Sequence, residues 1–319
     1  IGQFTSIAFD DLGNLIVVYA STYAFAKKYA TGIFGTLVYI PDSNFEQVLI
    51  DLGYDDLLDS YVIASSISGI TSLDVSFKNI EDLTGIEGFV SLTSLHCQVN
   101  QLSSLDVSQN AELTILNCDN TQLSSLDVTQ NPELVSLSCD YNQISDLNLN
   151  QNTALTFLSC YNNQLSSINV SQAPGLTSLL CYNNQLTSLD LQNGNNSIIL
   201  SLNATNNPLL KCIKVDNESD ASAGLSPYNN WQKDAHTIYL EDCNSIYVPD
   251  PNFEQALIDV GIDTDETINQ HVLRVDAEEV TSLNVSNKNI VHDIILLHSP
   301  GYSSRAENIC CANLCRHFD

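Results

Sequence analysis

Five cysteines recur at a fixed interval along the middle of the chain. Cys97, Cys118, Cys139, Cys160 and Cys181 are each separated from the next by 21 residues. Thiols placed in this way could form disulfides, bind a metal or serve catalysis, or they could pack as small apolar side chains. The choice depends on how the chain folds between one cysteine and the next.

The cysteines belong to five consecutive segments that align without gaps. Each segment follows the pattern L-x-x-L-x-C-x-x-N-x-L-x-x-L-x-V, as in "LTFLSCYNNQLSSINVSQAPG" at 155–175, and weaker copies lie at 70–80 and 199–209. This pattern resembles the leucine-rich repeat, and the resemblance covers roughly residues 62–210. It implies a leucine-rich-repeat solenoid with a parallel β-sheet on its concave face, few helices, coils that are mostly β and loop, and a short helical N-terminal cap.

Stacked coils of this kind favour packing as the role of the thiols. Parallel strands in register lie about 4.8 Å apart, so the five sulfurs should form a single file inside the solenoid. Tetrahedral zinc needs ligands that converge from several directions, which side chains of one ladder do not supply. We therefore expect the cysteines to act as small hydrophobes, with a disulfide within the file and a metal as the alternatives.

Two files of polar residues accompany the thiols. Asn100, Asn142, Asn163 and Asn184, with Thr121 in the missing place, match the asparagine ladder of leucine-rich repeats, where the side-chain amide bonds backbone groups at the bend. The second file has one member in each coil: Asp106, Asp127, Asn148, Asn169 and Asp190. Neighbouring carboxylates raise each other's pKa unless a cation intervenes, so Asp106, Asp127 and Asp190 are calcium candidates. Capping of turns by Asp and Asn is the alternative, and no other cofactor is expected.

The charge of the chain narrows the class of partner. The 319 residues include 38 Asp and Glu against 10 Lys and Arg, a formal net charge of −28, and no Lys or Arg lies between Lys78 and Lys211. Such a chain repels phosphate backbones and anionic lipid, so we expect no nucleic-acid partner. No apolar run reaches the roughly 18 residues of a spanning helix, so we expect no membrane insertion.

Six segments are expected along the chain. Residues 39–61 should form the helical N-terminal cap, with Ser43 and Glu46 as a capping box and Phe45, Val48, Leu49 and Leu52 on one helical face. The solenoid should follow at 62–210 and a C-terminal cap at 211–246. Residues 247–290 begin a second cap and array, because "YVPDPNFEQALIDVGID" at 247–263 nearly repeats 39–55. Residues 1–38 include a strand-turn-strand pattern that resembles part of a propeller blade.

The C-terminal cap and the tail carry the remaining cysteines. In secreted bacterial leucine-rich-repeat proteins, which the closing segment resembles, a pair such as Cys212 and Cys243 is bridged, and this implies a disulfide and an oxidising compartment. The composition changes abruptly at 291–319. We expect this tail to be disordered or non-native; the alternative is a zinc site formed by Cys310, Cys311, Cys315 and His317, although their spacing is not that of known zinc motifs.

The sequence favours recognition over catalysis. It contains no Walker-type loop, no G-x-S-x-G and no H-E-x-x-H, so we expect no enzymatic activity. Alternation along the strands should leave a binding face on the concave sheet: His96, Gln98, Asn117, Asp119, Ser138, Asp140, Phe157, Ser159, Tyr161, Leu180, Tyr182 and Asn203. Phe157, Tyr161, Leu180 and Tyr182 should cluster there, as aromatics commonly do in protein or glycan contacts.

The predicted function is thus adhesion or recognition of a protein or polysaccharide through the concave face. We expect a monomeric module within a larger parent chain, on a secreted or surface-anchored bacterial protein. Two alternatives remain, a targeting or stalk module of a larger secreted enzyme and a calcium-stiffened structural spacer.

Overall fold

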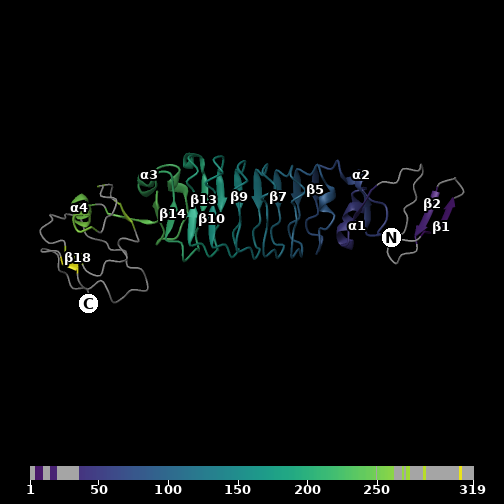
Figure 1. Ribbon diagram of the computed structural model, residues 1–319, viewed down its shortest axis with the longest axis horizontal. Coiled ribbons are helices and arrows are strands. Elements are labelled where there is room, and N and C mark those ends of the chain that lie inside the picture. The colour runs from purple at the N-terminus through teal and green to yellow at the C-terminus, as the bar shows by residue number, and fades with distance from the viewer. Residues whose placement is uncertain are drawn as a thin grey trace. The chain divides into compact units, whose positions relative to one another are not determined.

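The computed structural model describes residues 36–248, 250–261, 268 and 271–273, together with the backbone of four short strands outside these ranges. Contacts divide the chain into two compact units, Ile1–Tyr239 and Leu240–Asp319. The coils, which occupy most of the first unit, are stacked side by side in Figure 1. Among the described residues, no helix has the length and apolar character that crossing a membrane would require.

A seven-stranded parallel sheet runs through the coils of the first unit. Neighbouring strands pair in register so that equivalent leucines lie opposite one another, for example Leu116 opposite Leu137. The 21-residue spacing causes this register because each coil returns the chain to the same position one strand further along. The strands, in order, are β5 (Ser72–Asp74), β6 (Ser94–His96), β7 (Ile115–Asn117), β8 (Ser136–Ser138), β9 (Phe157–Ser159), β11 (Ser178–Leu180) and β13 (Ser201–Asn203).

A second sheet lies on another side of the coils and has four strands. β10 (Ser167–Asn169) pairs in parallel with β12 (Ser188–Asp190), and β12 pairs in the same way with β14 (Cys212–Lys214). β15 (Ile238–Leu240) completes this sheet next to β14. The predicted parallel solenoid with few helices is confirmed.

The five repeated cysteines lie in the core between the leucines. All five are free and fully buried. The Cys97 thiol donates to the carbonyl oxygen of Asn117 in the next coil at 3.3 Å, and the Cys118 thiol does the same to Ser138 at 3.5 Å. Burial raises the pKa of all five thiols, that of Cys181 to about 12, so they stay protonated. The prediction that they act as small hydrophobes is confirmed.

The asparagine ladder pairs the backbone groups at the bend after each strand. The Asn163 Nδ2 donates to the carbonyl oxygens of Cys139 and Cys160 at 2.9 and 3.2 Å, and its Oδ1 accepts from the Ile144 N–H at 3.0 Å. Asn207 continues the ladder. A second buried file went unpredicted, in which Asn110, Asn131 and Asn152 donate to carbonyls of preceding coils.

The N-terminal end of the stack is covered by the predicted cap. β3 (Leu37–Tyr39) pairs antiparallel with β4 (Tyr61–Ile63), and α1 (Ser43–Asp51), α2 (Ala64–Ile67) and the 3-10 turn η1 (Ile86–Gly88) complete this end. The residues of α1 predicted to face the core are buried except Leu52, which is 48% exposed because it follows the last turn of the helix.

The predicted capping box of α1 is wrong. Asp42 is the N-cap, and its Oδ1 accepts from the N–H groups of Asn44 and Phe45 at 2.8 and 3.0 Å. Ser43 is therefore the first helical residue. The buried Glu46 instead accepts from the Asp59 and Tyr61 N–H groups at 2.9 and 3.1 Å, which fixes the loop after the helix.

Aromatic residues cover the other end of the stack. Tyr228 and Trp231 meet edge to face with ring centroids 4.6 Å apart, and Trp231 Nε1 donates to the carbonyl oxygen of Ile199 at 2.8 Å. Tyr239 packs against both rings. The short elements here are η2 (Asn196–Ile198), α3 (Glu218–Ser222) and η3 (Tyr228–Asn230).

The second unit contains a copy of the cap helix. α4 (Pro251–Asp259) is capped by Asp250, whose Oδ1 accepts from the Asn252 and Phe253 N–H groups just as Asp42 does in α1. β16 (Ser245–Tyr247) pairs antiparallel with β17 (His271–Leu273). β18 (Leu283–Asn284) pairs in parallel with β19 (Ile309–Cys310).

The remaining predictions for the two ends fall largely outside the described residues. In the first unit β1 (Phe4–Phe9) and β2 (Leu15–Tyr19) form an antiparallel pair, but the rest of residues 1–35 is not described. The predicted tail and its zinc alternative at Cys310, Cys311, Cys315 and His317 lie outside them too, apart from the backbone of β19. The six predicted segment boundaries stay predictions.

Candidate binding face

The third residues of the sheet strands form the first file of the predicted binding face. The parallel register places His96, Asn117, Ser138, Ser159, Leu180 and Asn203 side by side in successive coils. Ser159 is buried, and the other five are half-buried. Since each strand residue before these is an inward leucine, alternation turns this file away from the core. We call this file, together with the file two residues further along each coil, the sheet face.

The second file of the sheet face begins with Gln98, Asp119 and Asp140. Asp119 Oδ1 accepts from the backbone N–H of Asp140 at 2.7 Å, and Asp140 Oδ1 accepts in turn from the N–H of Tyr161 at 2.9 Å. The hydroxyl of Ser138 donates to Asp119 at 2.8 Å, and that of Ser159 donates to Asp140 at 2.7 Å. The two carboxylates therefore link three successive coils.

Asp140 has the most perturbed environment on the sheet face. Asp140 is 4% exposed, and its burial raises the pKa of its carboxyl to about 7. The hydrogen bond from Ser159 lowers this pKa, while the negative charge of Asp119 raises it further. Asp140 thus exchanges its proton near neutral pH, which the sequence did not indicate.

Tyr161 and Tyr182 continue the second file beyond the carboxylates, and Tyr141 lies beside them. The rings of Tyr161 and Tyr182 are stacked, with centroids 4.3 Å apart and planes 10° from parallel. Tyr141 meets Tyr161 edge to face at 5.3 Å. Tyr141 was missed because it stands one position later in its coil, in "CDYNQ" where the next two coils have "CYNNQ".

The structure places the other two members of the predicted cluster elsewhere on the sheet. Phe157 begins β9 in register with Ser136 and Ser178, and Leu180 belongs to the first file. Among the described residues no ring contact joins Phe157 to the tyrosines. The cluster that forms is Tyr141, Tyr161 and Tyr182.

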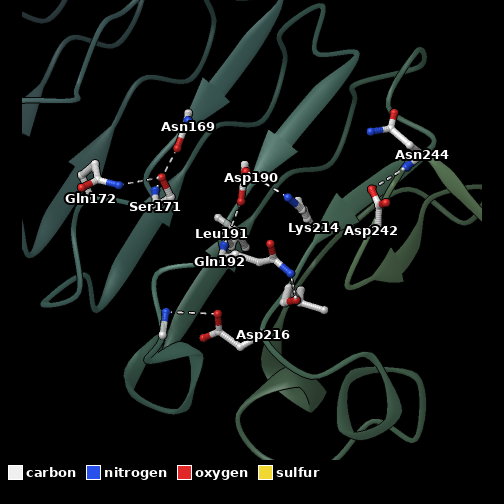
Figure 2. Close-up of polar contacts among 12 residues, drawn as sticks. Asn169, Ser171, Gln172, Asp190, Leu191, Gln192, Lys214, Asp216, Asp242 and Asn244 are labelled. Carbon is white, nitrogen blue, oxygen red and sulfur yellow. Dashed lines mark hydrogen bonds and ion pairs between the residues drawn. The ribbon is translucent and has the colours of Figure 1, made fainter.

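The calcium candidates precede turns and cap them. Asp106 Oδ1 accepts from the Ser108 N–H at 2.9 Å, and Asp127 Oδ1 accepts from the Thr129 N–H at 2.9 Å. These hydrogen bonds lower the pKa of both carboxyls, whereas their proximity in the sequence pattern suggested that it would rise. Figure 2 shows the same contact at Asn169 and Asp190.

An ion pair joins Asp190 to the neighbouring strand of the second sheet. Lys214 Nζ lies 3.8 Å from Asp190 Oδ2 (Figure 2). Among the described residues, no cluster of three or more His, Cys, Asp or Glu is arranged to hold a metal ion. Turn capping accounts for one oxygen of each carboxylate, and calcium binding by the file stays a prediction.

Cys212 and Cys243 differ from the repeated cysteines. Both are disulfide-bonded. Cys212 begins β14, the third strand of the second sheet, directly after the last coil. Their pairing with each other stays a prediction.

Comparisons with known proteins point to bacterial repeat proteins. No family model matches the chain. Internalin J of Listeria monocytogenes serotype 4b (strain F2365) is 34% identical over 72 residues, which are 23% of this chain and 8% of Internalin J. The solved functional domain of InlJ from Listeria monocytogenes includes a cysteine ladder and is 28% identical, with a TM-score of 0.52. That match covers 66% of this chain and 49% of the InlJ chain.

A further solved structure is internalin C2 from Listeria monocytogenes str. 4b F2365. It is 16% identical with a TM-score of 0.44, and the match covers 63% of this chain and 94% of that one. The InlJ match agrees with three features of this chain, namely the 21-residue period, the buried file of thiols and the parallel sheet. This chain is a leucine-rich-repeat solenoid that resembles bacterial proteins with 21-residue, cysteine-containing repeats.

Proposed function

We propose that this chain is a non-catalytic recognition module that binds a protein or polysaccharide through its sheet face. The observation that carries the proposal is the contact of Tyr141, Tyr161 and Tyr182 beside the linked carboxylates of Asp119 and Asp140. Aromatic side chains next to fixed polar groups are the usual composition of binding hot spots.

The proposal includes an extracellular bacterial setting. Disulfide-bonded Cys212 and Cys243 fit an oxidising compartment, and the similarity to Internalin J supports a bacterial origin. The five buried thiols fit it as well, because burial and a raised pKa protect them from oxidation.

The test removes two rings of the tyrosine cluster together. The wild-type chain is first screened against a panel of purified polysaccharides and extracellular proteins. Tyr161→Ala with Tyr182→Ala should then abolish binding to every member of the panel that the wild-type chain binds. Both rings are only half-buried, so the thermal midpoint should change by no more than a few degrees. Surface plasmon resonance and thermal melting measure the two effects.

A matched control changes two exposed turn residues instead. Gln130→Ala with Gln151→Ala should leave both binding and melting unchanged, since both side chains are exposed and lie in turns. Equal binding by the tyrosine variant and the control would exclude the sheet face as the recognition surface.

A further inference from the structure

A file of left-handed residues runs along the edge of the sheet face. The residue two positions after each inward Cys, Val or Ala has a positive φ: Phe77, Val99, Asn120, Tyr141, Asn162, Asn183 and Asn206, with values from 53° to 59°. The N–H of each of the first six bonds the next coil, as Tyr141 N does to the Tyr161 carbonyl oxygen at 3.1 Å, and the Asn206 N–H donates to Asp234 Oδ1 at 2.9 Å. The file therefore keeps the register of the strands. We call these seven residues the left-handed file.

Asparagine is the residue that the left-handed file favours. Asn tolerates a positive φ better than other residues with a side chain, whereas β-branched and bulky residues rarely adopt it. Asn also bonds along the file, because Asn183 Nδ2 donates to Asn162 Oδ1 and Asn206 Nδ2 donates to Asn183 Oδ1, each at 2.7 Å. The other three members, Phe77, Val99 and Tyr141, lack both advantages.

These three apolar members do not contribute to the core. Phe77 is 68% exposed and Tyr141 is 57% exposed, while Val99 is half-buried. A bulky side chain in a strained backbone conformation stabilises a fold only if it is buried, so folding does not explain their presence. Strain of this kind is commonly retained at binding sites.

The geometry of the tyrosines disfavours a flat sugar ring as the ligand. Tyr161 has ring partners on both sides, Tyr182 stacked at 4.3 Å and Tyr141 edge-on at 5.3 Å. One face of Tyr161 is therefore covered by Tyr182, and the contact with Tyr141 further limits stacking with a pyranose. The exposed ring of Tyr141 adjoins the acidic residues of the sheet face, an arrangement that suits a cation.

The negative charge of the coils indicates the sign of the charge that a partner should carry. Asp119 and the buried Asp140 lie along the sheet face, and no Lys or Arg occurs between Lys78 and Lys211 to balance them. Complementary charge steers association and suppresses partners of the wrong sign. An apolar edge beside an acidic face requires a partner that offers both apolar and cationic side chains.

We propose that the ligand is a basic segment of a partner protein, whose apolar side chains contact Phe77, Val99 and Tyr141 and whose Lys or Arg side chains approach Asp119. This inference rests on the proposed recognition function and selects a protein over a polysaccharide. It assigns a role to Phe77, Val99 and Tyr141, none of which the sequence pattern identified.

The probes are three molecules of known chemistry. A synthetic peptide of alternating Arg and Leu should bind the chain, with affinity that falls as salt is raised. Its alternating Glu and Leu counterpart and dextran, a neutral polysaccharide, should not bind. Fluorescence anisotropy of the labelled probes measures each affinity.

Removal of one carboxylate tests where the basic peptide binds. Asp119→Asn keeps an oxygen for the Asp140 N–H and should weaken binding about fivefold, as expected for a half-exposed charge pair. Asp127→Asn removes the same charge from a turn and should leave binding unchanged. Equal weakening by both variants would overturn the proposal, because it would show attraction to the net charge alone.

Restoring asparagine to the left-handed file separates binding from folding. Tyr141→Asn would extend the amide file between Asn120 and Asn162, and Val99→Asn would relieve a strained β-branched residue. Both variants should keep or raise the thermal midpoint, by up to about 4 °C, while weakening the Arg and Leu peptide severalfold. A lower midpoint with unchanged binding would show that these side chains only pack, and would overturn the proposal.

The experiments distinguish this inference from the function on which it rests. If a polysaccharide binds and is lost in Tyr161→Ala with Tyr182→Ala while the Arg and Leu peptide does not bind, the sheet face is a recognition surface and the basic partner is wrong. If no ligand depends on the two tyrosines, both proposals fail.

Discussion

The inward and outward positions of the same coils differ in how much their residue types vary from coil to coil. The inward file is Cys from Cys97 to Cys181, flanked by leucines that are almost completely buried. One residue further along each coil, the outward file changes from Gln98 through Asp119 and Asp140 to Tyr161 and Tyr182. Stacking therefore constrains the interior to one repeated composition, while the exposed positions are available for specific contacts.

The largest expected effect comes from emptying one inward position. Leu158→Ala should lower the free energy of unfolding by about 2–5 kcal/mol, because Leu158 is fully buried between Leu137 and Leu179. The outward neighbour provides the control, since Phe157→Ala should cost less than the inward change. Urea denaturation measures both, and equal losses would contradict the division into inward and outward positions.

Loss of one ladder amide should be the next largest effect. Asn163→Ala leaves the buried Ile144 N–H without its partner and removes one of the two amide donors from each of the Cys139 and Cys160 carbonyls, which should cost about 1–3 kcal/mol. Gln164→Ala alters an exposed neighbour and should change the midpoint of urea denaturation little. A stable Asn163 variant would mean that the amide ladder is not needed at the bend.

Asp140 should make stability depend on pH across the sheet face. Its pKa of about 7 in the folded chain lies above the ordinary value of 3.8, so the folded state holds the proton more tightly than the unfolded state. The stabilisation that this proton provides is complete below about pH 4 and is lost as the pH rises through about 7. Asp140→Asn should therefore be more stable than the wild-type chain at pH 8, by about 1–3 kcal/mol.

The difference in stability between the wild-type chain and Asp140→Asn separates the effect of Asp140 from that of the other carboxyls. Asp106 and Asp127 have lowered pKa values, so the stability that they contribute is lost as the pH falls, in the opposite sense. Thermal melting of both chains from pH 4 to pH 9 should show curves that diverge as the pH rises. Parallel curves would show that Asp140 is charged at neutral pH.

The smallest effect is expected at the thiols. Cys139→Ala removes only a sulfur atom and should cost about 1 kcal/mol, which is typical for deletion of one buried group. In the native chain the five buried thiols should resist alkylation, because burial raises their pKa. Peptide mass spectrometry separates them from the other cysteines, and fast labelling of Cys139 without denaturant would show that its coil opens.

The sequence predicted the solenoid because its signal is repeated five times and each coil can bury its leucines only against a neighbour. The N-cap residue of α1 was harder to predict. Asp42 and Ser43 are both good N-cap residues, and only the folded loop, in which Asp59 and Tyr61 donate to Glu46, makes a capping box with Ser43 impossible.

The candidate site was only partly predictable for a similar reason. Strand alternation placed Asp119, Asp140, Tyr161 and Tyr182 on an outward face, since that depends on the period of the chain alone. The ring contacts of Tyr141 and the raised pKa of Asp140 depend on distances between coils, and these distances are absent from a one-dimensional pattern.

The sequence by itself determined the repeat length, the inward leucine and cysteine files and the acidic charge of the coils, because periodic burial and composition are properties of the chain. Only the tertiary structure decided which outward residues meet. Stacking brings residues 21 positions apart to the spacing of neighbouring strands, and at that range a buried carboxyl, a tyrosine stack and a left-handed edge acquire their properties from each other.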